Sequence, residues 1–202
     1  MTTYNLNIEK LAEENKVPVS GSNRHIHVSQ ADLEVLFGPG YQLKKMKDLS
    51  QPGQFAAQEC VTIVGPKAKK EGVRILGPVR PQTQIELMAT DCCHMGFETV
   101  VRNSGDTPET PGATIIGPAG TVTIKEGVIV AARHLHLHTS EAQKFGFKDK
   151  DKVSAKTFGD RTLTFHGVLI RVHDEYALDM HLDLDEMNAA HLKNGDLVQL
   201  IR

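Results

Sequence analysis

Two stretches decide the fold, Arg24-His25-Ile26-His27 and Arg133-His134-Leu135-His136-Leu137-His138. In both, polar and apolar residues alternate, which is typical of a strand with one face in the core. Each leads through a Ser or Thr into a short helical segment, and these segments end at Phe37-Gly38 and Phe145-Gly146. This repeated strand-to-helix element predicts two related halves within one chain.

Short strand-like runs fill most of the remaining chain. Gly-Pro pairs separate many of them, and such pairs break helices and favour turns. Helical patterns are few, at 5–16, 30–37, 140–145 and 185–192. We expect strands over 61–64, 73–76, 100–102, 114–116, 121–124, 128–131, 152–156, 162–165, 168–172 and 197–201. So many short strands favour closed barrels over a sandwich of long strands.

Composition excludes several classes of protein. The 202 residues are 40% hydrophobic, and a net charge of −2 gives no overall bias toward nucleic acid or an anionic membrane. No apolar run approaches the roughly 20 residues of a membrane span, and the N-terminus lacks a signal-peptide core. Three cysteines make no disulfide framework. We therefore expect a soluble, cytoplasmic protein.

The histidines carry the chemistry. His-x-His on a strand places both imidazoles on one face, so His25 and His27 converge, as do His134 and His136. Two imidazoles at this spacing can clamp a metal, although a solvated polar face is the simpler alternative for a single pair. Zinc needs three or four N, O or S ligands. Cobalt and nickel suit the same ligand types.

Each pair needs a third ligand. His181 lies in an alternating segment, and Glu86 is a carboxylate in an apolar setting that calls for a partner. A surface strand position is the alternative for Glu86, since spacing alone does not select it. By contrast, Cys92-Cys93-His94 lacks the spacing of zinc knuckles, and we interpret it as packing.

Several cations lie at predicted strand ends. Lys67 and Arg74 can meet phosphate groups, and Arg80 can bind one bidentately. Ser104-Gly105-Asp106 is a turn with a hydroxyl group. For each of these residues, a solvated surface position is the alternative.

Taken together, the motifs closely resemble those of the PduL-type phosphotransacylases, or phosphate propanoyltransferases. The resemblance runs from about residue 17 to residue 202 and rests on six segments in one order: Ser22-Asn23-Arg24-His25-Ile26-His27, Gln51-Pro52-Gly53-Gln54-Phe55-Ala56, Gly77-Pro78-Val79-Arg80-Pro81-Gln82-Thr83-Gln84-Ile85-Glu86, Arg102-Asn103-Ser104-Gly105-Asp106, Arg133-His134-Leu135-His136 and Met180-His181-Leu182-Asp183.

The resemblance implies a set of site residues. Two zinc ions are implied, one held by His25, His27 and Glu86 and the other by His134, His136 and His181. It implies a phosphate-binding role for Arg80, with Ser104 beside the phosphate. The implied coenzyme A contacts are Gly21, Ser22, Asn23, Lys67, Arg74 and Asn188.

It also implies a mostly β fold of two small β-barrel domains capped by short helices. The first barrel would comprise 14–23 and 132–202, and the second 24–37 and 59–131. Residues 38–58 would form a lid over the active site, and residues 1–13 an N-terminal helix or extension.

The implied reaction is acyl-CoA + phosphate ⇌ acyl phosphate + CoA, with a short acyl group such as propanoyl or acetyl, by direct attack of phosphate on the thioester at a two-zinc site. The sequence does not choose which zinc polarises the carbonyl. A zinc-dependent thioesterase or phosphoester hydrolase is the alternative enzyme, and a structural zinc protein the non-enzymatic one. Nucleic acid and membranes are not expected partners.

Two departures bear on partners and on the site. Members that enter bacterial microcompartments carry an amphipathic N-terminal helix, and the candidate here, residues 5–16, is short and acidic. Shell or cargo proteins of a microcompartment are candidate partners of this helix. A second copy of the chain is a separate candidate partner. His138 is an extra histidine after the second pair, and we expect it to face solvent.

Overall fold

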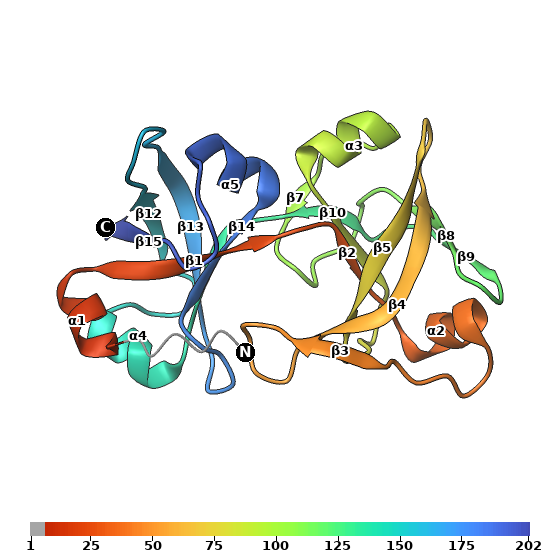
Figure 1. Cartoon of the computed structure of the whole chain (residues 1–202), viewed down its shortest axis with the longest axis horizontal. Coiled ribbons are helices and arrows are strands. Elements are labelled where there is room, and N and C mark those ends of the chain that lie inside the picture. Colours follow the sequence, from red (N-terminus) through yellow and green to blue (C-terminus); the bar gives the residue numbers. More distant parts are fainter. Residues whose placement is uncertain (1–6) are drawn as a thin grey trace. The chain divides into compact units, whose positions relative to one another are not determined.

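The chain folds into two compact units, each with its own hydrophobic core. The computed structural model describes residues 7–202 (Figure 1). The first unit comprises the described part of Met1–Ser22, Ser50–Pro52 and Ala132–Arg202, and the second comprises Asn23–Leu49 and Gly53–Ala131. Strands dominate and the helices are short, so the prediction of a mostly β fold is confirmed.

The first unit is a closed barrel with the strand order β1-β14-β11-β13-β12-β15. Its strands are β1 (Lys16–Ser22), β11 (His134–Leu137), β12 (Lys152–Lys156), β13 (Thr164–Val172), β14 (Asp179–Asp183) and β15 (Leu197–Ile201). Strand β1 closes the barrel because it pairs parallel to β14, beside it in Figure 1, and antiparallel to β15. Leu135 and Leu137 enter the core, so the histidines that alternate with them lie on the opposite face of β11.

Three short helices belong to this unit: α1 (Ile8–Glu13), α4 (Thr139–Phe145) and α5 (Leu184–Ala190). The helix expected over 5–16 is shorter than predicted, and residues 5 and 6 lie outside the described residues. Leu11 of α1 lies in the barrel core, and Ile8 and Ala12 pack against it. Helix α1 is therefore part of the packed unit.

The second unit is a curled sheet with the strand order β7-β10-β6-β2-β5-β4-β8-β9, and β3 pairs with β4. Its strands are β2 (His25–His27), β3 (Lys45–Asp48), β4 (Phe55–Val64), β5 (Lys69–Gly77), β6 (Gln84–Leu87), β7 (Val101–Arg102), β8 (Ala113–Ile116), β9 (Thr121–Ile124) and β10 (Val128–Ala131). Its helices are α2 (Gln30–Phe37) and α3 (Ala89–Met95). Ile26 of β2 is completely buried in the core, between two histidines that face the other way.

Three local features differ from the sequence-based expectations. Helix α3 was not predicted, and it carries Cys92 in the core while Cys93 is exposed. The segments 162–165 and 168–172 are largely one strand, β13. The segment 38–58 contains β3 and the start of β4.

Within that last segment, Ser50–Pro52 belong to the first unit. The buried Gln51 side chain donates to the carbonyl oxygen of Ala177 at 3.0 Å and accepts from its N–H at 3.2 Å. These two bonds fasten Ser50–Pro52 to the loop that leads into β14. Separately, no helix formed by residues 7–202 has the length and apolar character to cross a lipid bilayer.

Candidate functional site

The first polar group of interest is built by β2 and β6 of the second unit. These strands run antiparallel, and their register places Glu86 opposite His25. The Glu86 side chain is only 7% exposed. Its Oε2 lies 3.4 Å from Nε2 of His25, and its Oε1 lies 3.8 Å from Nε2 of His27. Two imidazoles and one carboxylate thus converge in a buried place, the arrangement that the family resemblance implied.

The tautomer of His25 follows from its surroundings. Its Nδ1 lies 2.8 Å from the carbonyl oxygen of Asn23. Because a carbonyl only accepts, Nδ1 must donate, and Nε2 presents its lone pair toward Glu86 when the ring is neutral. Backbone anchoring of this kind orients metal-binding histidines in many proteins.

Electrostatics favour a cation at this group. Burial, together with the charges of His25 and Arg80, lowers the pKa of His27 to about 3, so this imidazole is neutral. Burial alone would raise the pKa of Glu86, but His25 and the hydrogen bond from Ser104 hold it well below its usual range. Burial likewise opposes protonation of His25, yet the Glu86 charge outweighs it and raises the pKa of His25. The neutral imidazole of His27 and the carboxylate anion of Glu86 can therefore both serve as metal ligands.

Ser104 and, through it, Arg80 are bonded to the same Glu86 carboxylate. Ser104 Oγ donates to Oε1 of Glu86 at 2.7 Å and accepts from a guanidinium nitrogen of Arg80 at 3.0 Å. The Arg80 backbone N–H also donates to the carbonyl oxygen of Val28, directly after β2. The structure thus brings Arg80 and Ser104, both predicted site residues, to the His25–His27–Glu86 group.

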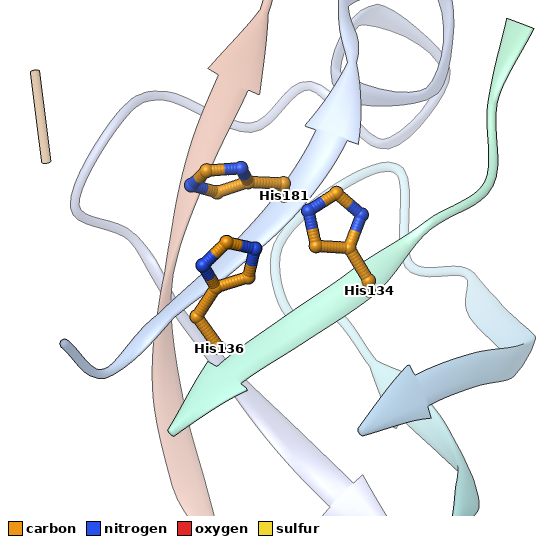
Figure 2. A group of neighbouring side chains, drawn as sticks. All are labelled: His134, His136 and His181. Carbon is orange, nitrogen blue, oxygen red and sulfur yellow. The ribbon is translucent and has the colours of Figure 1, made fainter. Parts of the chain in front are cut away.

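The second group lies on the barrel of the first unit. His134 and His136 project from β11, and His181 projects from the antiparallel β14, where it pairs with His134. Figure 2 shows the three rings facing one another. Their centroids are separated by 4.7 Å for His134 and His136, 5.0 Å for His134 and His181, and 4.9 Å for His136 and His181.

The hydrogen bonds of this group leave nitrogen lone pairs available. Nδ1 of His134 lies 2.8 Å from the carbonyl oxygen of Ala132, two residues earlier, just as His25 is bonded to Asn23. Both ring nitrogens of His136 are buried, and neither has a hydrogen-bond partner among residues 7–202. Burial and the neighbouring His181 and His134 lower the pKa of His136. A buried, neutral imidazole without partners fits a metal ligand, because a metal ion would satisfy it.

In each group, one ligand atom from every residue lies within 4.8 Å of the others. The donors are N,N,O in the first group and N,N,N in the second, and both sets suit zinc and related divalent ions. Three protein ligands leave a coordination position open for a substrate atom, in contrast to a closed structural site.

The predicted coenzyme A contacts are divided between the two units. Gly21 and Ser22 end β1 beside β14, and Asn188 is exposed on α5. A Cβ atom at Gly21 would lie 2.8 Å from a methyl group of Leu184, so α5 packs closely only against glycine there. Gly21 N–H also donates to the Asn194 side chain. Gly21 and Ser22 therefore lie at the base of α5, the helix that carries Asn188.

The other three predicted contacts belong to the second unit. Arg74 pairs with His25 across β5 and β2, and its guanidinium donates to the carbonyl oxygens of Ala57 and Gln58 at 2.9 Å each. Asn23 directly precedes this region and anchors His25. Lys67 lies instead in the β4–β5 turn, where its N–H donates to the carbonyl oxygen of Met95. Arg74 and Asn23 thus adjoin the first group, whereas Lys67 packs against the end of α3.

His138 has a local role. It is the N-cap of α4, where its Nδ1 accepts from the N–H of Ser140 at 3.1 Å. The Glu141 side chain accepts in return from the His138 N–H at 2.8 Å. The ring is half-buried and bonded at the helix end, so it is less free in solvent than the sequence suggested.

Sequence reasoning did not single out three residues that contact the two groups. Gln84 bonds to Glu86, Asp179 bonds to His181, and the Tyr176 ring packs 4.4 Å from that of His136. Strand alternation offered a signal for the first two, because each lies two residues before a predicted ligand and so on the same face.

Comparisons with known proteins agree with the motifs. A family described as phosphate propanoyltransferase matches residues 18–193. A phosphate propanoyltransferase from Thermotoga maritima is 52% identical over 95% of this chain and 91% of its own length. A relative with the same description from Rhodopseudomonas palustris is 48% identical over 93% of this chain and 83% of its own length. Another from Clostridioides difficile is 43% identical over 96% of this chain and 93% of its own length. The chain belongs to the phosphate propanoyltransferase family, whose members are acyltransferases.

Proposed function

We propose that this protein interconverts a short-chain acyl-CoA and phosphate with an acyl phosphate and coenzyme A. Propanoyl-CoA is the proposed substrate, with acetyl-CoA as a close second because one methylene changes binding in an apolar pocket by only about 1–3 kcal/mol. Relatives named phosphate propanoyltransferase support the reaction class. The observation that carries the proposal is the bonded series Arg80–Ser104–Glu86, which joins the proposed phosphate-binding guanidinium to the proposed metal-binding group.

Two zinc ions are proposed as cofactors. His25, His27 and Glu86 would hold one, and His134, His136 and His181 the other. Bound zinc would supply a Lewis acid, which lowers the cost of charge on a thiolate or a carbonyl oxygen. The protein's part is to orient the imidazoles, and the carbonyl oxygens of Asn23 and Ala132 do so for one imidazole in each group, His25 and His134.

Arg80 is the proposed phosphate-binding residue. Phosphate is already an anion near neutral pH, so its attack on a thioester needs positioning more than a strong base. A planar guanidinium can bind two of the four phosphate oxygens at once, which orients the other two. Ser104 holds one nitrogen of the Arg80 fork, so the orientation of the fork is set before substrate binds.

Coenzyme A is the proposed second substrate, with Gly21, Ser22, Asn23, Lys67, Arg74 and Asn188 as its contacts. In this scheme the acyl group passes directly from sulfur to phosphate oxygen, and the thiolate leaves. No enzyme nucleophile is needed, and the cysteines are spectators. The setting of Cys92 supports this, since its side chain is buried in the core of the second unit.

Thiol release from propanoyl-CoA tests the function, measured on metal-loaded protein with and without phosphate. We expect release that depends on phosphate and stops when a chelator removes the metal. Equal release without phosphate would instead identify a metal-dependent thioesterase. Absence of release with any short acyl-CoA would refute the proposed activity.

The proposed setting is the cytoplasm, including the interior of a bacterial microcompartment. Helix α1 constrains how a shell or cargo protein would bind, because Leu11 is committed to the barrel core. A partner would contact the polar side of α1, which carries the exposed Glu9 and Glu13. The domain boundaries 14–23 with 132–202 and 24–37 with 59–131, the lid over 38–58 and a homo-oligomer remain part of the proposal.

A further inference from the structure

Each histidine group has a fourth polar side chain at the same relative position. In the second unit, β6 pairs Glu86 with His25 and Gln84 with His27. In the first unit, β14 pairs His181 with His134 and Asp179 with His136. Gln84 and Asp179 thus both lie opposite the second histidine and two residues before the third ligand. They are among the most buried polar residues of the protein, at 2% and 4% exposure.

The Gln84 amide uses both of its N–H donors and one lone pair of its oxygen. Its nitrogen donates to Oε1 of Glu86 at 2.7 Å and to Oγ of Ser104 at 3.0 Å. Its oxygen accepts from the N–H of Gly105 at 2.6 Å. A flipped amide would turn its oxygen toward the carboxylate and its NH₂ toward a backbone donor, so only one orientation satisfies all partners.

This arrangement differentiates the two oxygens of Glu86. Oε1 accepts from both Gln84 and Ser104, whereas Oε2 faces Nε2 of His25 at 3.4 Å. Oε2 is therefore the oxygen left for a metal. The bond to Gly105 also fixes the turn that presents Ser104 to Arg80.

Asp179 is a hydrogen-bond acceptor toward His181, whereas Gln84 is a donor toward Glu86. The Oδ2 atom of Asp179 lies 3.1 Å from Nε2 of His181. Because a carboxylate only accepts hydrogen bonds, Nε2 of His181 must carry the proton. A proton held there leaves the other ring nitrogen, Nδ1, with its lone pair. Figure 2 shows the His181 ring facing those of His134 and His136.

We propose that Gln84 and Asp179 are matched positioning residues, one in each unit, that select which atom of the third ligand is offered to the metal. The polarity is complementary in both: an amide donor beside a carboxylate ligand, and a carboxylate acceptor beside an imidazole ligand. This inference rests on the proposed metal-binding function of the two groups. It assigns to each group a residue that acts only through its neighbour.

Site-resolved metal affinity tests the inference. Full-length protein loaded with zinc is titrated with a competing chromophoric chelator, and His25→Ala and His136→Ala identify which release step belongs to which group. Gln84→Met should weaken the first group about 10–100-fold and leave the second unchanged. Asp179→Leu should do the reverse.

Two conservative variants separate polarity from packing. Gln84→Glu keeps the shape but sets a second carboxylate against Glu86, so it should weaken the first group at least as much as Gln84→Met. Asp179→Asn keeps an acceptor oxygen and should weaken the second group less than Asp179→Leu. The exposed residues Gln82 and Asp174 provide controls, since Gln82→Met and Asp174→Asn should leave both affinities unchanged.

The outcomes distinguish this inference from the proposed function. Two bound zinc ions in the unsubstituted protein, with equal affinities in all the variants, would refute the positioning role alone. Equal losses from both groups, accompanied by a lower melting temperature, would make Gln84 and Asp179 merely structural. A chain that binds no zinc would overturn the metal-binding function as well.

Discussion

At the scale of single residues, Arg80 combines a positive charge with an orientation that is fixed by hydrogen bonding. Its guanidinium bonds to Ser104, and Ser104 bonds to Glu86 through its own hydrogen. Arg80→Ala should remove most of the phosphate-dependent activity, because phosphate loses its bidentate partner, while zinc content stays near normal. Arg80→Lys keeps the charge without the fork and should recover only part of the activity. Loss of zinc in Arg80→Ala, measured by elemental analysis, would contradict a phosphate-binding role.

The buried imidazoles predict how stability changes with pH in the metal-free protein. The pKa of His27 is lowered to about 3 from an ordinary 6.5. Between these values the unfolded chain binds a proton that the folded chain does not, so stability falls as pH falls from about 6.5 toward about 3. One such histidine contributes a slope of about 1.4 kcal/mol per pH unit, and His136 acts in the same direction.

Urea unfolding across this pH range measures the slope. His27→Gln removes the titrating group, and its slope should be shallower by about one proton. An exposed histidine such as His166, replaced by Gln, serves as the control and should leave the slope unchanged. Identical slopes in the unsubstituted protein and His27→Gln would count against a neutral His27.

At the scale of elements, helix α4 explains the extra histidine of the second motif. His138 caps the helix through Nδ1, and the Glu141 side chain accepts in return from the His138 N–H, which completes a capping box. His138→Ala should cost about 1 kcal/mol of stability, as the loss of other N-caps does, whereas His138→Asn retains a capping side chain. Neither should alter the zinc content. A selective loss of one zinc ion in His138→Ala would show that this residue belongs to the metal group.

Helix α1 makes a second prediction about an element. Leu11 packs in the barrel core, with Ile8 and Ala12 against it. Leu11→Ala should lower the free energy of unfolding by about 2–5 kcal/mol, because a buried side chain is lost and a cavity remains. The exposed Glu13 on the same helix is the control, and Glu13→Ala should change stability by less than about 0.5 kcal/mol. Equal stability of Leu11→Ala and the parent in denaturant would mean that α1 is not part of the folded unit.

At the scale of the whole molecule, the sequence predicted the strand face of a residue better than the residues that it contacts. Alternation placed His25, His27, His134 and His136 correctly because the strand period does not depend on the rest of the fold. Helix α3 was missed because its seven residues offer only a short apolar repeat, in which Cys92 and Met95 pack in the core of the second unit. The choice of Glu86 came from the family resemblance.

Gln84 shows why the contacts of the remaining site residues could not be predicted, although strand alternation places its side chain on the same face as that of Glu86. Its role depends on the register between β2 and β6, strands that are far apart in the chain. It depends equally on the turn at Gly105, which brings Ser104 back over β6. Such tertiary pairings determine contacts that no local pattern contains.

The identity of the phosphorus product tests the central claim most directly. Propanoyl-CoA, phosphate and the metal-loaded protein are followed by phosphorus nuclear magnetic resonance while free thiol is measured in parallel. We predict a new acyl phosphate signal that rises in step with the thiol and is lost in Arg80→Ala. Thiol release with free propanoate and no acyl phosphate signal would contradict direct transfer to phosphate.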